Sequence, residues 1–269
     1  MPYFAAISNM PASYLIREGF ERVLSARFND AMFFFNEDVS VPFDSYYKKL
    51  SSIVFHKSLG SMEERVKRIE EIAQLLSEKT GLSNSKWIKR AALLSKNDLV
   101  TEMVGEFPEL QGVMGKIYAD DEEDEISLSI EEQYLPKGKI LPQTETGTIL
   151  ALAGAFELLI SVGSVEMPTS SKDPYGLRRA AIGIIRILLE KGIDLNTDDI
   201  FSLYDSILKN KKKNSISTIK RFFNDRFRGI LIDRGIRYDI ADAVCFRDDK
   251  NQMAINCFDA YNTGVALFT

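Results

Sequence analysis

Apolar residues recur every three to four positions along almost the whole 269-residue chain, and this spacing is the strongest constraint on the fold. The only strand-like run is YFAAIS, at residues 3–8. The run that follows Ser61 shows the helical pattern best, because Ser61 can cap a helix, Glu64 stands at the capping-box position and Gly81 follows the end. We therefore expect an all-α fold with one short strand at the N-terminus.

Several segments carry this helical period, and the most apolar of them, 148–162, is expected at the centre of the core. Its apolar stretch is too short to span a bilayer, and the N-terminus lacks the basic region of a signal peptide. The cytoplasm is therefore the expected location. The segments expected to be helical are 13–38, 44–55, 61–80, 84–106, 148–162, 177–191, 194–213, 216–234 and 239–245.

The charge and the rare residue types exclude several classes of function. With 34 Lys plus Arg against 39 Asp plus Glu, bulk positive charge cannot drive nucleic-acid binding, although a local basic patch still can. His56 is the single histidine, so most catalytic triads and histidine-rich metal sites are excluded. Cys245 and Cys257 have no CxxC spacing, and they fit a reducing compartment. No glycine-rich phosphate loop is present.

The stretch PTSSKDPYGLRRAA, at residues 168–181, carries the most local information. Ser170, Ser171 and Asp173 offer oxygens that can cap a helix there, and Pro174 suits its first turn. Arg178 and Arg179 then fall early in the helix, where cations oppose the helix dipole. An anion such as phosphate, bound by these arginines and by free backbone N–H groups, would explain them, with Lys172 adding a third positive charge. Internal salt bridges to the acidic surface explain them equally well, so both interpretations stay open.

A second basic cluster lies further along the chain and alternates with phenylalanines. Basic residues together with aromatic residues can indicate nucleic-acid binding. At this spacing, however, the phenylalanines are also typical of a core and the lysines of a solvated loop. The cluster consists of Lys209, Lys211, Lys212, Lys213, Lys220, Arg221, Arg226 and Arg228, with Phe222, Phe223 and Phe227 between them.

Several blocks of the sequence resemble, in order, the beta subunit of the bacterial tetrameric (α2β2) glycyl-tRNA synthetase. EFPELQGVMG and SKDPYGLRRAA are the longest and most specific of these matches, and together the blocks cover nearly the whole chain. The blocks are YFAAISN (3–9), ERVLSARFNDAMFFFNED (21–38), LGSMEERVKRI (59–69), LLSKNDLVTEMVGEFPELQGVMGKIYA (93–119), YLP (134–136), PTSSKDPYGLRRAA (168–181) and GIRYDIADAV (235–244).

The resemblance implies that this chain is an internal segment of a longer beta subunit. It also implies a division of the chain into four parts. These are the end of a preceding domain at 1–12, an HD-like helical domain at 13–205, a basic linker at 206–215, and a truncated anticodon-binding-like helical segment at 216–269.

True HD phosphohydrolases hold a metal ion with a His, a His-Asp pair and a later Asp. The resemblance places Ser95 and Lys96 at the His-Asp pair and Met62 near the first His. The family usually reads ALADKLD where this chain reads ALAGAFE, which places Gly154 and Glu157 at the later Asp segment. The metal-binding motif is therefore lost, which suggests a purely structural core. An HD-type metal-dependent phosphohydrolase is an alternative that this loss disfavours.

In this family the alpha subunit carries the site that makes glycyl-adenylate, so ATP and Mg are implied for that subunit. The beta subunit is similar to a tRNA-holding and assembly subunit. The resemblance therefore implies a segment of glycine–tRNA ligase with no catalytic site, metal or cofactor of its own. Expected partners are the alpha subunit and tRNA(Gly), and neither DNA nor a membrane is expected. A purely structural helical assembly module that touches no RNA is the second alternative.

Positively charged side chains would position the tRNA through its phosphates without reading much sequence. The first candidates come from the helix-start argument, and the second group opens the anticodon-binding-like segment. The candidates are, first, Lys172, Arg178 and Arg179, and second, Lys220, Arg221, Arg226 and Arg228.

Overall fold

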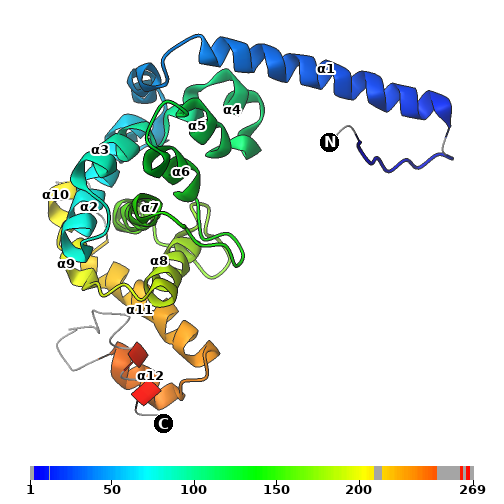
Figure 1. Ribbon diagram of the computed structural model, residues 1–269. Helices are drawn as coiled ribbons and strands as arrows, with labels where there is room; N and C mark the ends of the chain where they lie inside the picture. Colours follow the sequence, from blue (N-terminus) through cyan, green and yellow to red (C-terminus); the bar gives the residue numbers. More distant parts are fainter. Residues whose placement is uncertain (1–2, 12, 209–213, 247–260, 263–264, 267–269) are drawn as a thin grey trace.

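The computed structural model describes residues 3–11, 13–208, 214–246, 261–262 and 265–266. Within these ranges the chain is mostly helical, which confirms the expected all-α class (Figure 1). The body runs from α4 and α5 at one end to α11 and α12 at the other. The α-helices are α1 (Tyr14–Val39), α2 (Met62–Thr80), α3 (Ser85–Leu94), α4 (Glu102–Glu106), α5 (Val113–Tyr118), α6 (Asp124–Glu132), α7 (Glu145–Val165), α8 (Leu177–Lys191), α9 (Thr197–Phe201), α10 (Tyr204–Leu208), α11 (Ile216–Asp233) and α12 (Tyr238–Cys245).

The predicted N-terminal strand is wrong. Residues 3–8 form no regular structure and their side chains are exposed. A strand needs a neighbour for its backbone hydrogen bonds, and no described segment pairs with this one. The two short strands of the described ranges lie elsewhere, where β1 (Val54–His56) pairs antiparallel with β2 (Gly60–Ser61). Strand β1 replaces the end of the helix predicted at 44–55, whose first part is the 3₁₀ helix η1 (Phe43–Ser52).

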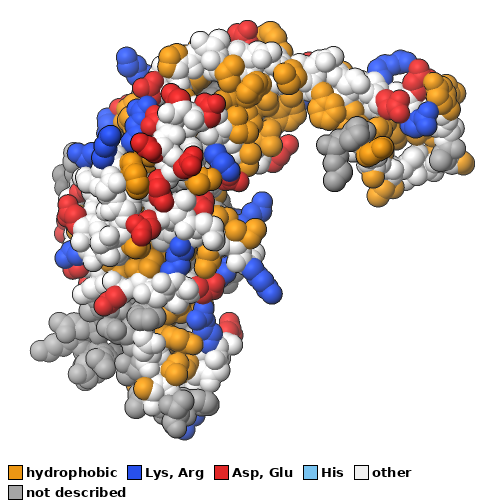
Figure 2. Space-filling view, viewed as in Figure 1, with side chains coloured by type: hydrophobic (Ala, Val, Ile, Leu, Met, Phe, Trp, Pro, Cys, Tyr) orange, Lys and Arg blue, Asp and Glu red, His pale blue; other side chains and the backbone are white. Residues whose placement is uncertain are grey.

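Helix α1 projects from the body and docks on it by apolar side chains of its C-terminal third and by an ion pair of 2.8 Å between Arg27 and Glu106 of α4 (Figure 1). The Ser13 hydroxyl caps its start by accepting the Ile16 N–H at 3.3 Å. Large apolar side chains along the rest of the helix, among them Val23 and Phe28, stay exposed (Figure 2). The side chains that dock the C-terminal third are Ala31, Phe34 and Phe35, which pack against Met103, Val104, Met114 and Tyr118.

The local signals at α2 and α8 are confirmed. The Ser61 hydroxyl accepts the Glu64 N–H at 3.3 Å while the Glu64 carboxylate accepts the Ser61 N–H at 2.8 Å, which completes the capping box. Gly81 ends α2 and Gly192 ends α8, both in the left-handed conformation that glycine adopts without strain.

The helix predicted at 84–106 is broken into three pieces. Helix α3 ends at Ser95, the 3₁₀ helix η2 (Asn97–Val100) follows, and α4 starts after Thr101. Short polar side chains cause the break by bonding to nearby backbone, as when the Thr101 hydroxyl donates to the Asp98 carbonyl at 2.7 Å. The break places four buried polar residues inside the body, Ser95, Lys96, Asn97 and Asp98. A further 3₁₀ turn, η3 (Pro108–Leu110), follows α4.

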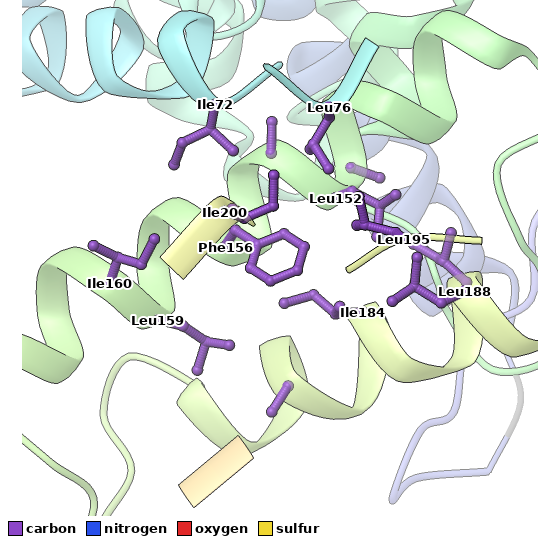
Figure 3. Close-up of a cluster of buried hydrophobic side chains, with 14 of the residues drawn as sticks. Ile72, Leu76, Leu152, Phe156, Leu159, Ile160, Ile184, Leu188, Leu195 and Ile200 are labelled. Atoms are coloured by element: carbon purple, nitrogen blue, oxygen red, sulfur yellow. The ribbon is translucent and has the colours of Figure 1, made fainter. Parts of the chain in front are cut away.

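Helix α7 is the centre of the core, as its apolar composition predicts (Figure 3). Phe156 is fully buried there against Phe201 and Phe223, at ring-centroid distances of 5.8 and 6.5 Å. By length and composition alone the helix could cross a membrane. However, 83% of its most apolar 18-residue stretch is buried inside the protein. Its apolar character is therefore explained by the packing of α2, α6 and α8 around it.

The C-terminal part follows the predicted helices with two changes. The single helix expected at 194–213 is two short helices, α9 and α10, and residues 209–213 lie outside the described residues. Helices α11 and α12 are present, and Asn224 ties them together by donating its amide to the Cys245 carbonyl at 3.0 Å. Cys257 lies outside the described residues. The division of the chain into four parts stays a prediction.

Candidate nucleic-acid interface and buried charge cluster

The start of α8 is shaped by the loop at 166–176, which contains the first group of predicted site residues. The Asp173 carboxylate accepts the N–H groups of Leu177 at 2.8 Å and Arg178 at 3.0 Å. These two N–H groups are therefore already satisfied by the chain's own carboxylate, and they are not free for an external anion. The anion site predicted at the start of α8 therefore depends on the basic side chains of this region and not on the dipole of the helix.

The three basic side chains of this region differ in how firmly they are held. Arg178 donates to the Thr169 carbonyl and lies 3.8 Å from the Asp173 carboxylate, and about a third of its side chain is exposed. Lys172 and Arg179 are exposed, and neither forms an ion pair with another residue of the described ranges. The salt-bridge interpretation therefore describes Arg178, while Lys172 and Arg179 are available to an external partner.

The second group of predicted site residues lies on α11, and its members also differ in whether they form ion pairs inside the chain. Lys220 pairs with Asp198 at 2.5 Å, and Arg228 pairs with Asp242, so internal ion pairs account for both. Arg221 is exposed and has no ion pair within the described part of the chain. The interleaved phenylalanines Phe222, Phe223 and Phe227 are buried in the core, as their helical spacing also predicts.

Arg226 lies 4.0 Å from the Asp225 carboxylate and is the member of the second group whose charge interacts with the first. Burial lowers the pKa of the Arg226 guanidinium, and the nearby positive charge of Arg178 lowers it further, against the opposing charges of Asp225 and Asp173. Its guanidinium also lies over the Phe222 ring, 4.0 Å from the centroid. Helices α8 and α11 pack on each other, so the charge of Arg178 acts on Arg226 although the two residues are far apart in the sequence. We call Lys172, Arg178, Arg179 and Arg226 the basic patch.

A cavity of about 340 Å³ opens beside the basic patch, inside the loop at 166–176. The loop holds its own shape, because the Thr169 N–H donates to the Lys172 carbonyl at 3.0 Å and the Thr169 hydroxyl accepts the Lys172 N–H at 3.2 Å. The ring of Tyr175 contacts the ring of His56 edge-on, with centroids 5.6 Å apart. The lining residues are Glu166, Met167, Pro168, Thr169, Lys172, Asp173, Pro174, Tyr175 and Leu177.

A buried charge cluster joins α2 and α7, and it includes Lys96 and Glu157, two positions that the sequence analysis compared with the HD motif. Glu157 of α7 is fully buried, and its carboxylate accepts Nε of Arg65 at 2.8 Å and Nε of Arg68 at 2.9 Å, both on α2. Arg68 also donates to the Leu59 carbonyl at 3.2 Å. A buried carboxylate held by two guanidinium groups is a stable arrangement only while all the partners stay in place.

Lys96 lies in the same cluster, with 6% of its surface exposed. Its ammonium donates to the Tyr134 hydroxyl at 3.0 Å. Burial lowers the pKa of Lys96 to about 7, with a further contribution from the positive charge of Arg65, while Asp98 and Glu157 act in the opposite direction. Burial also raises the pKa of Asp98, against the hydrogen bond of 2.6 Å that the Gly112 N–H donates to its carboxylate.

The geometry gives the residues of the buried charge cluster a role in packing and charge balance. The lysine and arginine side chains of this cluster repel cations rather than bind them. In the described ranges no three His, Cys, Asp or Glu side chains lie close enough together to hold a metal ion. Sequence reasoning missed Arg65 and Arg68, although a lone glutamate in an apolar helix already requires buried partners.

Outside the basic patch, acidic and basic side chains are interspersed over the visible face of the body (Figure 2). The fold and the site together define an all-α protein whose candidate site is a local patch of exposed cations beside a small cavity. The profile of the family described as glycyl-tRNA synthetase beta subunit matches residues 1–246. The chain belongs to that family.

Similar proteins carry the same description. The chain is 41% identical over 284 residues to the glycine–tRNA ligase beta subunit of Acinetobacter baumannii, covering 99% of this chain and 41% of that protein. It is 43% identical over 258 residues to the one from Sulfurihydrogenibium sp., covering 93% and 36%. For Shouchella clausii the identity is 40% over 259 residues, covering 91% and 37%. The chain thus spans well under half the length of these relatives.

Proposed function

We propose that this chain is a tRNA-holding segment of glycine–tRNA ligase, which positions tRNA(Gly) while the alpha subunit performs the chemistry. The relatives are beta subunits of that ligase, and the family match covers most of the chain. The observation that supports an RNA contact is the exposure of Lys172 and Arg179, which form no ion pair within the described ranges and lie on either side of Arg178 in the sequence. Exposed cations without an internal counter-charge suit contact with the phosphates of an RNA backbone.

The proposal assigns no chemical step to this segment. Its buried cluster has the wrong residue types for metal-assisted hydrolysis, and its exposed cations suit phosphate contacts that hold an RNA backbone in place. ATP, Mg and adenylation belong to the alpha subunit in this proposal, and the cytoplasm is the compartment in which it applies. The partners are therefore the alpha subunit and tRNA(Gly).

Salt-dependent binding tests the phosphate contacts. Labelled tRNA(Gly) is titrated with the chain by fluorescence anisotropy over a KCl series. The double variant Lys172→Gln/Arg179→Gln removes two exposed cations that hold nothing else together among the described residues. We expect weaker binding and a plot of log affinity against log salt that is shallower by roughly 1 to 2 units.

A matched control removes the same charge elsewhere. Lys48 and Lys86 are also exposed and form no ion pair within the described ranges, so Lys48→Gln/Lys86→Gln gives the same change in net charge away from the basic patch. This control should keep the slope of the parent chain. Equal slopes for the two double variants would place the tRNA contacts outside the basic patch.

The second candidate function is a helical module that only stabilises the alpha subunit. The internal pairing of Lys220 with Asp198 and of Arg228 with Asp242 favours it, because these cations are already neutralised. This candidate predicts that the chain associates with the alpha subunit in a salt-insensitive way and that tRNA(Gly) does not bind even at low salt.

A further inference from the structure

The cavity in the loop at 166–176 has the size and the walls of a site for one flat ring system. Its volume of about 340 Å³ is at the lower end of ligand pockets, which is too small for a helix or a folded peptide segment. Met167 and Tyr175 at its wall pack on the main core, so that side of the cavity is fixed. Thr169 and Lys172 also line the cavity, and two hydrogen bonds between them hold their turn in shape. The cavity is therefore a formed feature of the fold.

The chemistry of the walls favours an aromatic ligand with polar edges. Met167, Pro168, Pro174 and the Tyr175 ring supply apolar and aromatic surface. The Tyr175 ring is held in its orientation by the edge-on contact with His56. Unpaired bases of RNA bind in this way, by stacking on aromatic side chains.

The rim carries charges that match a nucleotide. Lys172 lines the cavity and also belongs to the basic patch, so a ligand in the cavity lies next to cations that suit its phosphate. Glu166 lines the cavity as well, and its exposed carboxylate can accept hydrogen bonds from the exocyclic amino group of a base. Asp173 also lines the cavity, but its carboxylate already accepts the N–H groups of Leu177 and Arg178.

We propose that the cavity at 166–176 binds one unpaired, amino-bearing base of the tRNA, stacked on Tyr175, while Lys172 and Arg179 contact the adjoining phosphates. This inference rests on the proposed tRNA-holding function and deepens it, because it adds a base contact to a surface that otherwise contacts only the backbone. Tyr175 is then a binding residue, and His56 positions its ring.

The test uses the same tRNA(Gly) titration with variants that change the cavity but not the charge. Tyr175→Ala removes the stacking surface and should weaken binding by about tenfold, the effect typical of losing one stacked base. Tyr175→Phe keeps the ring and should bind like the parent chain. Because no phosphate contact is lost, the salt slope should be the same for all three proteins.

A second variant distinguishes the loss of the base site from misfolding of the loop at 166–176. Pro174 is exposed and lines the cavity without a side-chain hydrogen bond, so Pro174→Trp adds bulk at the cavity while Tyr175 stays in place, and it should weaken binding by a similar factor at an unchanged slope. Parent-like affinity for both Tyr175→Ala and Pro174→Trp would overturn the base site and leave the phosphate contacts standing. A changed slope for Tyr175→Ala would also overturn it, because Tyr175 would then act by positioning the cations. If the parent chain binds no tRNA at low salt, the proposed function fails and the base site fails with it.

Discussion

The Tyr118 hydroxyl on α5 donates a hydrogen bond of 2.8 Å to the carboxylate of Asp38 at the end of α1. The same carboxylate accepts the backbone N–H groups of Glu102 at 2.9 Å and Met103 at 3.0 Å, which open α4. Asp38 is 2% exposed and is the one buried residue of α1. A single carboxylate therefore joins the projecting helix to the first turn of α4, where a negative charge is also favoured by the helix dipole.

Replacing Asp38 by alanine should lower the free energy of unfolding by about 3 kcal/mol. The substitution leaves the two N–H groups and the Tyr118 hydroxyl without their buried acceptor, and each such loss costs about 1 kcal/mol or more. Urea denaturation followed by circular dichroism measures the change. Asp30→Ala, an exposed site on the same helix, is the control and should stay within about 0.5 kcal/mol of the parent. A similar small change for Asp38→Ala would show that α1 is held by its apolar contacts alone.

Lys96 should make the stability of the protein depend on pH above neutrality. Its pKa is lowered to about 7 in the folded chain and is about 10.4 when unfolded, so the unfolded chain binds more protons between these values. Stability therefore rises as the pH increases from about 7 to 10, by at most about 1.4 kcal/mol per pH unit from this group. Below pH 7 the charged ammonium is buried in the folded state and destabilises it.

Lys96→Met tests this pH dependence because it removes the charge and keeps the length of the side chain. Urea midpoints measured at pH 6, 8 and 9.5 should rise with pH in the parent and rise less in the variant, which should be more stable than the parent at pH 6. The exposed substitution Lys48→Met is the control and should leave the parent's profile unchanged. Parallel profiles for the parent and Lys96→Met would mean that Lys96 stays charged in the folded chain at every pH tested.

The buried ion pairs of Glu157 give a prediction in two parts. Glu157→Gln leaves the guanidinium groups of Arg65 and Arg68 buried without a counter-charge, and it should destabilise the protein by about 3 to 5 kcal/mol. The triple variant Glu157→Leu/Arg65→Met/Arg68→Met removes all the charges together and should recover most of this loss. Thermal and urea unfolding of both variants measures the difference. A triple variant less stable than Glu157→Gln would show that the ion pairs themselves stabilise the fold.

Local signals allowed much of the helical structure to be predicted from the sequence. The capping box of Ser61 and Glu64 and the left-handed glycines Gly81 and Gly192 depend only on neighbours within a few residues, and all are found where the sequence places them. The break at 95–100 was not predicted, because apolar periodicity continues through it while the polar side chains bond to local backbone. The hairpin of β1 and β2 was missed for its shortness.

Contacts between residues that are distant in the sequence could not be predicted from it. Nothing local indicates that Glu157 meets Arg65, 92 positions away, or that the charge of Arg178 acts on Arg226. The sequence identified both basic groups as candidates, but which cations are neutralised depends on tertiary packing, as the pairing of Lys220 with Asp198 shows. The individual tRNA contacts stay predictions that the binding experiments address.

Gly112 offers a test of how tightly the buried charge cluster is built. Its φ of +85° is a conformation that side chains rarely adopt, and a Cβ there would lie 2.7 Å from the ring of Tyr134. Its N–H also donates to the Asp98 carboxylate at 2.6 Å, so the backbone cannot shift freely. Gly112→Ala should therefore combine backbone strain with overpacking and destabilise the protein by about 2 to 4 kcal/mol.

The same substitution at Gly154 should change the free energy of unfolding in the opposite direction. Gly154 lies inside α7, and a Cβ added there meets no heavy atom within 4 Å, so Gly154→Ala should stabilise the protein by about 0.5 to 1 kcal/mol through helix propensity. Differential scanning calorimetry of the two variants measures both changes. Because Tyr134 accepts the hydrogen bond from Lys96, Gly112→Ala should also alter the pH dependence of stability above pH 7, while Gly154→Ala should shift stability equally at every pH. A Gly112→Ala variant as stable as the parent would mean that the loop before α5 relaxes around Tyr134 at little cost.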